Sequence, residues 1–324
     1  MAPQPRIKVA ICICTFRRRT LLRQLLNGVA QLRFRKVSSP ELKIIIVDND
    51  EFASAQEVCK SVSSPWPIEY VLERNRGITY ARNRAIVEAG SVDFVAFIDD
   101  DEVPSSDWLD ELLSTQSKFS ADVVTGPVLP CYAPEIASWI KRGRFFGSRS
   151  LPTGTLRGTC ASNNVLIAAH VFRAVPGFDH SFAVSGAEDT NFFLRVMRTG
   201  YKIVWCQEAS VVETVPATRG IVTWILRREY QTGNGWVFCE SEMDNSLRRW
   251  ITRFFRACGH VVIGFARAIL SSLALDRPGI VHALRQTSLG TGMLAGLAGI
   301  RFLAYRDPNS TRNNYTVQHH MSNS

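Results

Sequence analysis

Short apolar runs alternate with helix-like stretches between residues 9 and 113, and this alternation restricts the chain to few folds. Continuous apolar runs are typical of strands buried on both faces of a parallel sheet. In the intervening stretches, apolar residues recur at spacings of three and four, the period of a helix. The pattern predicts an α/β fold with a right-handed, mostly parallel sheet and flanking helices. The expected strands are 9–14, 43–47, Ile68–Leu72 and Phe94–Ile98.

Polar and acidic residues follow three of these runs where the strands are expected to end. Thr15 follows the first run, Asp-Asn-Asp at 48–50 follows the second, and Asp-Asp-Asp-Glu at 99–102 follows the fourth. Ligands of open α/β sheets bind at the carboxyl ends of the strands. The sequence therefore predicts a binding crevice at this edge. It contains neither the GxGxxG fingerprint nor a P-loop, which disfavours dehydrogenases and P-loop enzymes.

The acidic group at 99–102 is the sharpest chemical signal in the chain. Adjacent carboxylates repel one another unless a cation is present. Carboxylate oxygens suit Mg²⁺ or Mn²⁺, which bind through one or two carboxylates and substrate phosphates. The alternative is an acidic loop that leads into the helix beginning near Trp108.

Other charged residues near this edge each have two interpretations. Arginine suits a diphosphate through bidentate bonds, but most of these arginines would also suit a solvated face. Asp48 could bind a base or ribose, or close a turn. Glu188 and Asp189 precede a helix-like stretch, so a carboxylate here could be a general base or an N-cap. The arginines are Arg17, Arg18, Arg19, Arg74, Arg76, Arg82 and Arg84.

The C-terminal third is basic and apolar together. From Arg219 onward there are thirteen arginines, no lysine and six acids, so this third carries +7 of the net charge of +9. Basic residues interleaved with apolar segments favour an anionic membrane surface, and no nucleic-acid partner is expected. The segment 257–275 just reaches the length of a spanning helix. Arg267 within it would be costly inside a bilayer, so we expect interfacial helices, with a soluble helical subdomain as the alternative.

These observations predict three parts. Residues 1–220 form an α/β domain that carries the predicted crevice, 221–310 a helical membrane-associating region, and 311–324 a disordered tail. The eight cysteines form no CxxC pair, which favours reduced thiols in the cytosol. We expect no signal peptide, because the apolar run at 9–14 is too short and is followed, not preceded, by the arginines at 17–19. We expect the protein at the cytoplasmic face of the inner (plasma) membrane, peripheral or shallowly inserted.

Seven segments in a fixed order carry a family resemblance. They are ICTF at 13–16, IIVDND at 45–50, NRGITYARNRAI at 75–86, FIDDDEVPSSDWL at 97–109, TGPV at 125–128, SNN at 162–164 and SGAEDTNFFLRVMRTGYKI at 185–203. Together they resemble the inverting nucleotide-sugar glycosyltransferases of family two, which have the GT-A fold. Within that family the chain looks most similar to the succinoglycan-type glucosyltransferases of bacterial exopolysaccharide assembly. The resemblance implies that residues 1–220 are the nucleotide-sugar-binding and catalytic domain.

The resemblance implies a role for each matching residue. Asp101, together with Asp99, would hold Mn²⁺ or Mg²⁺. Asp189 would be the catalytic base, with Glu188 beside it. Asn163 and Glu188 would face the donor or acceptor sugar. The residues that would bind the nucleotide sugar are Thr15, Arg17, Asp48, Arg82, Asp99 and Asp100.

Two departures from the family pattern limit this transfer. Many relatives carry a metal-binding histidine after the last core strand, and this chain has Val-Val-Glu at 211–213 instead. The QxxRW motif of processive synthases is reduced to Arg-Glu-Tyr at 228–230, which favours a single-addition enzyme.

The sequence predicts an inverting, metal-dependent hexosyltransferase. Its donor would be a nucleotide sugar, with uridine the expected base, and its acceptor a hydroxyl of a glycan or polyprenyl-linked molecule. One alternative is a sugar-phosphate nucleotidyltransferase, although Thr15-Phe16-Arg17 lacks the glycines of a phosphate loop. The other is a non-catalytic nucleotide-sugar-binding scaffold at a membrane.

Overall fold

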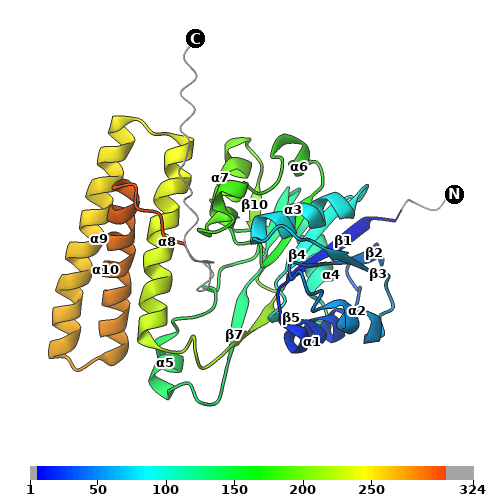
Figure 1. Ribbon diagram of the computed structural model, residues 1–324, viewed down its shortest axis with the longest axis horizontal. Coiled ribbons are helices and arrows are strands. Elements are labelled where there is room, and N and C mark those ends of the chain that lie inside the picture. The colour runs from blue at the N-terminus through cyan, green and yellow to red at the C-terminus, as the bar shows by residue number, and fades with distance from the viewer. Residues whose placement is uncertain (1–5, 304–324) are drawn as a thin grey trace, which may run out of the picture.

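The structure, a computed structural model, describes residues 6–303. An eight-stranded mixed sheet forms the core of one side of the molecule, opposite three long C-terminal helices (Figure 1). The strand order is β3-β2-β1-β4-β9-β6-β10-β8. Neighbouring strands from β3 to β4 are parallel, as predicted, whereas β9 runs antiparallel to both β4 and β6. The strands are β1 (Lys8–Thr15), β2 (Glu41–Asp48), β3 (Ile68–Leu72), β4 (Phe94–Ile98), β6 (Val123–Thr125), β8 (Leu156–Arg157), β9 (Asn164–Ala168) and β10 (Ile203–Trp205).

Helices cover both faces of this sheet, and a small second sheet extends from its edge. Strand β11 lies between β5 and β7, antiparallel to β5 and parallel to β7. The small strands are β5 (Glu102–Pro104), β7 (Val128–Tyr132) and β11 (Val211–Val215). The helices of this part are α1 (Arg19–Val29), α2 (Gln56–Ser61), α3 (Ile78–Ala89), α4 (Trp108–Phe119), α5 (Ser138–Gly143), α6 (Val171–Ala174), η1 (His180–Phe182) and α7 (Glu188–Arg198).

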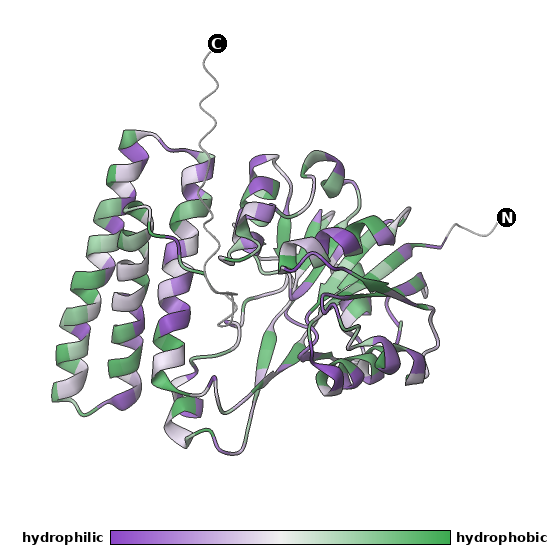
Figure 2. Ribbon diagram, in the orientation of Figure 1, coloured by the Kyte–Doolittle hydropathy of each residue, from purple (hydrophilic) through white to green (hydrophobic). Residues whose placement is uncertain are grey.

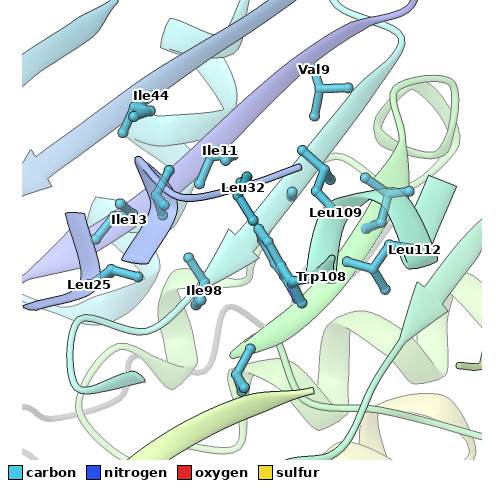
Figure 3. Close-up of a cluster of buried hydrophobic side chains, with 14 of the residues drawn as sticks. Val9, Ile11, Ile13, Leu25, Leu32, Ile44, Ile98, Trp108, Leu109 and Leu112 are labelled. Atoms are coloured by element: carbon cyan, nitrogen blue, oxygen red, sulfur yellow. The ribbon is translucent and has the colours of Figure 1, made fainter. Parts of the chain in front are cut away.

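Alternate residues of the central strands fill two separate cores. Ile11, Ile13 and Ile44 face one side, where they pack with Trp108 and the helices α1 and α4 (Figure 3). Their neighbours Ala10, Cys12 and Ile45 face the other side, toward α3 and α7. Burial on both faces explains why these strands read as continuous apolar runs. The prediction of an α/β fold with a mostly parallel sheet is confirmed.

Three long helices form the C-terminal part, and α10 lies between the other two (Figure 1). They are α8 (Val222–Met243), α9 (Leu247–Leu273) and α10 (Arg277–Leu297). Each helix is longer than the stretch that the sequence pattern indicated for it, which was 223–230 for α8, 257–275 for α9 and 289–304 for α10. Helix α9 begins ten residues before the apolar stretch because Ser246 caps it, accepting a hydrogen bond from the Arg249 amide. The predicted tail at 311–324 lies outside the described residues.

Glycines allow these helices to approach closely. A Cβ on Gly292 of α10 would lie 2.0 Å from the Tyr230 carbonyl oxygen of α8. A Cβ on Gly264 of α9 would lie 2.4 Å from the Thr287 hydroxyl of α10. A further cluster that includes Ile140, Val215, Ile225, Val281 and Ile136 packs α5 and β11 against α8 and α10. The three helices are therefore joined to the rest of the molecule through a hydrophobic core.

Candidate active site

The predicted acidic group lies in the turn between β4 and β5, beside the end of β1. Asp100 accepts hydrogen bonds from the Thr15 hydroxyl at 2.7 Å and from Arg18 Nη1 at 2.7 Å. Asp101 Oδ2 lies 3.0 Å from the same Arg18 nitrogen and 3.1 Å from Arg219 Nη2. Arg18 and Arg219 thus partly neutralise the negative charge of this turn, which we call the carboxylate turn (residues 99–101).

Burial and mutual repulsion raise the pKa of several carboxyl groups here. Glu102 is 1% exposed, and loss of water raises its pKa well above the ordinary value. The charges of Asp99, Glu213 and Asp101 raise it further. Burial likewise raises the pKa of Asp100, although Arg18 opposes that shift. The carboxylate turn is therefore a place where added positive charge would be stabilising.

Arg82 connects the carboxylate turn to the first turn of α7. This side chain of α3 is 5% exposed. Its Nη1 lies 2.5 Å from Glu188 Oε1 and 2.8 Å from Asp189 Oδ1. Its Nη2 lies 3.6 Å from Asp99 Oδ1. One guanidinium group thus holds the proposed base and a proposed metal ligand near each other.

Residues just before β9 complete the arrangement. The Ser162 hydroxyl donates to Asp189 Oδ1 at 2.6 Å, and the Ser162 amide donates to Oδ2 at 3.3 Å. The Asn163 amide group donates to Glu102 Oε1 at 2.7 Å. Because β9 is antiparallel to β4, its first residue pairs with Ile98, the last residue of β4. The segment that enters β9 therefore reaches the same edge as the segments that leave the parallel strands.

Asp48 organises the loop after β2. Its side chain is fully buried and accepts hydrogen bonds from the Ala55 amide at 2.7 Å, the Asp50 amide at 3.1 Å and the Tyr70 hydroxyl at 3.1 Å. These bonds are those expected of a residue that closes a turn, the alternative named above. Its role in binding a nucleotide base stays a prediction.

Arg17 lies at the rim of the same loop. Its Nε donates to Asp50 at 3.1 Å, and its guanidinium group lies 4.9 Å from the centre of the Phe16 ring and 5.6 Å from that of Phe52. Phe52 is 73% exposed. Arg18, one residue later, carries the contacts to the carboxylate turn.

The carboxylate turn offers oxygen atoms that fit a hard divalent cation. Asp101 Oδ2 accepts from Arg219 Nη2 at 3.1 Å, and Asp99 Oδ1 lies 3.6 Å from Arg82 Nη2. In the described part of the chain, the second oxygen of each carboxylate accepts no hydrogen bond. Two carboxylate oxygens within one turn match the protein ligands that Mg²⁺ or Mn²⁺ commonly takes, with phosphate and water completing the shell.

The sequence did not predict the roles of four residues in this network. They are Arg18, which contacts the carboxylate turn, Ser162, which contacts Asp189, and the ion-paired residues Arg219 and Glu213. Arg219 links Asp101 to Glu213 Oε1, which lies 2.7 Å from Arg219 Nη1. Glu213 stands where the resemblance led us to look for a histidine, and strand pairing places it opposite Glu102. The carboxyl-rich edge thus contains one more acid than expected.

Comparisons with known proteins agree with this geometry. Residues 10–175 match the family described as Glycosyl transferase family 2, and residues 94–275 match Glycosyl transferase family group 2. The chain is 33% identical to the succinoglycan biosynthesis protein ExoM of Rhizobium meliloti (strain 1021), over 92% of this chain and 96% of that protein. It is 26% identical to the glucosyl-dolichyl phosphate glucuronosyltransferase of Haloferax volcanii, over 70% of this chain and 75% of that protein.

Solved structures share the fold at low sequence identity. Residues 1–349 of S. aureus TarS in complex with UDP align with a TM-score of 0.51 and 13% identity, covering 90% of this chain and 92% of that one. The same protein with UDP-GlcNAc aligns with a TM-score of 0.51 and 12% identity over the same shares. The family match and the relationship to ExoM establish that this chain belongs to glycosyl transferase family 2.

Proposed function

We propose that this protein is an inverting, metal-dependent glycosyltransferase that moves a hexose from a UDP-sugar to an acceptor hydroxyl. The observation that carries the proposal is the Arg82 network. Through it Asp189, the proposed base, and Asp99 of the carboxylate turn contact the same guanidinium group. A base next to a group that binds a metal diphosphate is the arrangement that a direct displacement at an anomeric carbon requires.

A uridine diphosphate donor is supported by the comparisons. The TarS structures that share this fold contain UDP or UDP-GlcNAc. In this chain Thr15, Arg17, Asp48, Arg82, Asp99 and Asp100 stay the proposed contacts to the nucleotide sugar. Phe52, exposed beside Arg17, adds an aromatic surface at the rim where a base could stack.

The proposed chemistry is one displacement. Asp189 accepts the proton of the acceptor hydroxyl as the oxygen forms its bond to the anomeric carbon. The bond from that carbon to the diphosphate oxygen breaks with its electron pair, so the anomeric configuration inverts. A bound Mn²⁺ or Mg²⁺, held by Asp101 and Asp99, would stabilise the charge of the leaving diphosphate. Ser162 orients the Asp189 carboxylate through two hydrogen bonds, and Asn163 and Glu188 would face the sugars.

The acceptor is proposed to be a glycan or a polyprenyl-linked sugar at the cytoplasmic face of the plasma membrane. One relative is named for a dolichyl phosphate-linked substrate and another for succinoglycan biosynthesis. Residues 1–220 would carry the chemistry and residues 221–310 the membrane association.

The test is thermal unfolding of the purified protein with UDP, GDP, TDP or CDP, each with and without Mn²⁺. A ligand at a hundredfold its Kd is expected to add about 2.7 kcal/mol of stability. We expect stabilisation by UDP that depends on Mn²⁺ and is lost in Asp101→Asn. If no nucleotide stabilises the folded protein with or without metal, the proposed donor site is wrong.

A control variant separates this site from other acidic groups. Glu111, Cys206 and Glu208 also lie close enough to share a metal ion. The variant Glu208→Gln is expected to keep the full response to UDP and Mn²⁺. If Glu208→Gln loses that response and Asp101→Asn keeps it, the metal binds at the group of Glu111, Cys206 and Glu208 and not at the carboxylate turn.

A further inference from the structure

The outer face of α9 is an apolar surface with no protein partner among the described residues. Phe255 is 68% exposed, Val262 66% and Leu273 79%, and Ile251 and Ile269 are also exposed. Spacings of four and seven residues place these five side chains along one face of the helix. Figure 1 shows α9 as the helix farthest from the large sheet, and Figure 2 shows hydrophobic residues along its length. We call these five residues the α9 outer face.

The positive charge of α9 favours an anionic lipid surface as the partner of this face. The helix contains five arginines and no acidic residue. Arg248 and Arg249 lie at its beginning and Arg267 near its end, and all three are exposed. Arginines at the margins of an apolar face can extend toward lipid phosphates while the apolar side chains enter the acyl region. A second copy of the same helix would instead bring arginines against arginines.

The contacts of the inner face fix the orientation. Arg253 is 4% exposed and donates to the backbone carbonyls of Glu240 and Asp244, and to the Glu240 carboxylate at 3.2 Å. On the same side, Gly264 fits against Thr287 of α10. By length and composition α9 is, among the described residues, the one helix that could cross a membrane. Crossing would separate Gly264 from α10 and carry Arg267 into hydrocarbon, which is costly.

We infer that α9 lies in the plane of an anionic bilayer, with its outer face in the interface and its inner face still packed on α10. This inference rests on the membrane location in the proposed function and deepens it by naming the surface and its orientation. It does not depend on the sugar chemistry. At 27 residues the helix is about 40 Å long, so its outer face offers an extended contact.

The experiment is flotation of the full-length protein with phosphatidylcholine vesicles that contain or lack phosphatidylglycerol. We expect binding to the anionic vesicles, with the partition coefficient reduced about tenfold or more in Phe255→Ser/Ile269→Ser. The matched control is Val87→Ser/Leu156→Ser, which removes two comparably exposed apolar side chains far from α9 in sequence and should bind like wild type. Arg249→Gln/Arg267→Gln should lose the preference for anionic lipid.

Three outcomes overturn the inference. Equal binding by the wild type and the outer-face variant would mean that another surface holds the lipid. Resistance of the bound protein to alkaline carbonate extraction would indicate a spanning helix. Self-association in solution that the outer-face substitutions abolish would assign the face to a second copy. Stabilisation by UDP and Mn²⁺, measured on the same variants, shows separately whether the donor site is intact, so the docking surface and the proposed function can fail independently.

Discussion

At the scale of single residues, two neighbours hold Asp189, the proposed base. Arg82 and Ser162 both contact its Oδ1. Asp189→Asn keeps the size of the side chain but removes the base. We expect glycosyl transfer to fall about a hundredfold or more, the usual contribution of a general base, while stabilisation by UDP and Mn²⁺ persists.

The measurement is release of UDP from a UDP-sugar in the presence of lipid extract that contains the acceptor. Glu57→Gln, which changes an exposed carboxylate of α2, is the control and should keep full activity. Transfer by Asp189→Asn at the wild-type rate would assign the base to another residue.

A second prediction concerns Glu102, whose pKa is raised by burial and by neighbouring carboxylates. A buried carboxylate with a raised pKa destabilises the fold when it is charged. The contribution of Glu102 to the free energy of unfolding is therefore most favourable below the ordinary glutamate pKa, and it is lost as the pH rises through the raised pKa. We expect Glu102→Gln to unfold at a higher temperature than wild type at about pH 8, and this advantage to shrink toward about pH 5. Calorimetry in the absence of metal measures the difference in unfolding temperature between the variant and wild type. A difference that does not change with pH would contradict the raised pKa of Glu102 as its cause.

Sequence reasoning identified the acids of the site more readily than their partners. The group at 99–102 stands out because four carboxylates directly follow a buried strand. Arg18 could not be distinguished from Arg17 in the same way. In the folded chain Arg17 adopts a positive φ of 57° and turns toward Asp50, which leaves Arg18 to face the acids. Such backbone detail depends on tertiary contacts that local patterns do not contain.

At the scale of helices, close packing against α10 depends on glycine. A Cβ at position 292 would lie 2.0 Å from the Tyr230 carbonyl oxygen, so the backbones of α8 and α10 would have to separate. We expect Gly292→Ala to destabilise the protein by about 1–3 kcal/mol, as overpacking does. Equilibrium denaturation measures this change.

The chain offers a matched control in α9. Nothing lies within 4 Å of a Cβ built on Gly259, so alanine there should fit. Gly259→Ala is expected to stabilise the protein by about 0.5–1 kcal/mol, because alanine is the better helix former. Equal effects from the two substitutions would show that propensity, and not packing, decides both.

The strands of the sheet were easier to predict than the C-terminal helices. Strands β1, β2 and β4 are buried on both faces or nearly so, and their apolar runs mark them directly. The edge strand β3 is only half-buried, but it is also mostly apolar. Helix α9 alternates arginines with apolar residues in its first ten positions, so its beginning lacked a clear apolar signal. The antiparallel direction of β9 is a long-range property, and the sequence around residues 164–168 contains no sign of it.

At the scale of the whole molecule, the C-terminal helices connect the proposed membrane-docking surface to the proposed catalytic edge. Asn191 of α7 donates to Glu242 of α8 at 2.5 Å, and the Cys239 thiol lies 3.4 Å from the Ala187 carbonyl oxygen, directly before Glu188. Helix α8 thus contacts the helix whose second residue, Asp189, is the proposed base. Docking through α9 would hold that base at a fixed height above the lipid.

This arrangement predicts a difference between two kinds of acceptor. The outer-face variant Phe255→Ser/Ile269→Ser should transfer sugar poorly to an acceptor embedded in anionic vesicles, because it no longer concentrates there. Transfer to a water-soluble acceptor analogue should be unchanged. Equal losses for both acceptors, measured as labelled product, would mean that the substitutions damage the catalytic part itself.

The reversed direction of β9 has a consequence for how such an enzyme can diversify. The long connection between β7 and β9 brings Ser162 and Asn163 to the proposed catalytic edge at its end, while Thr15, Asp48 and Asp100, the residues proposed for the donor, follow other strands. Residues 133–161 can therefore vary at their exposed positions, provided that the pairing of β8 with β10, the packing of Ile136 and Ile140 and the junction with β9 are kept. Under the proposed function, such variation would alter the acceptor side while the residues proposed for the donor stay the same.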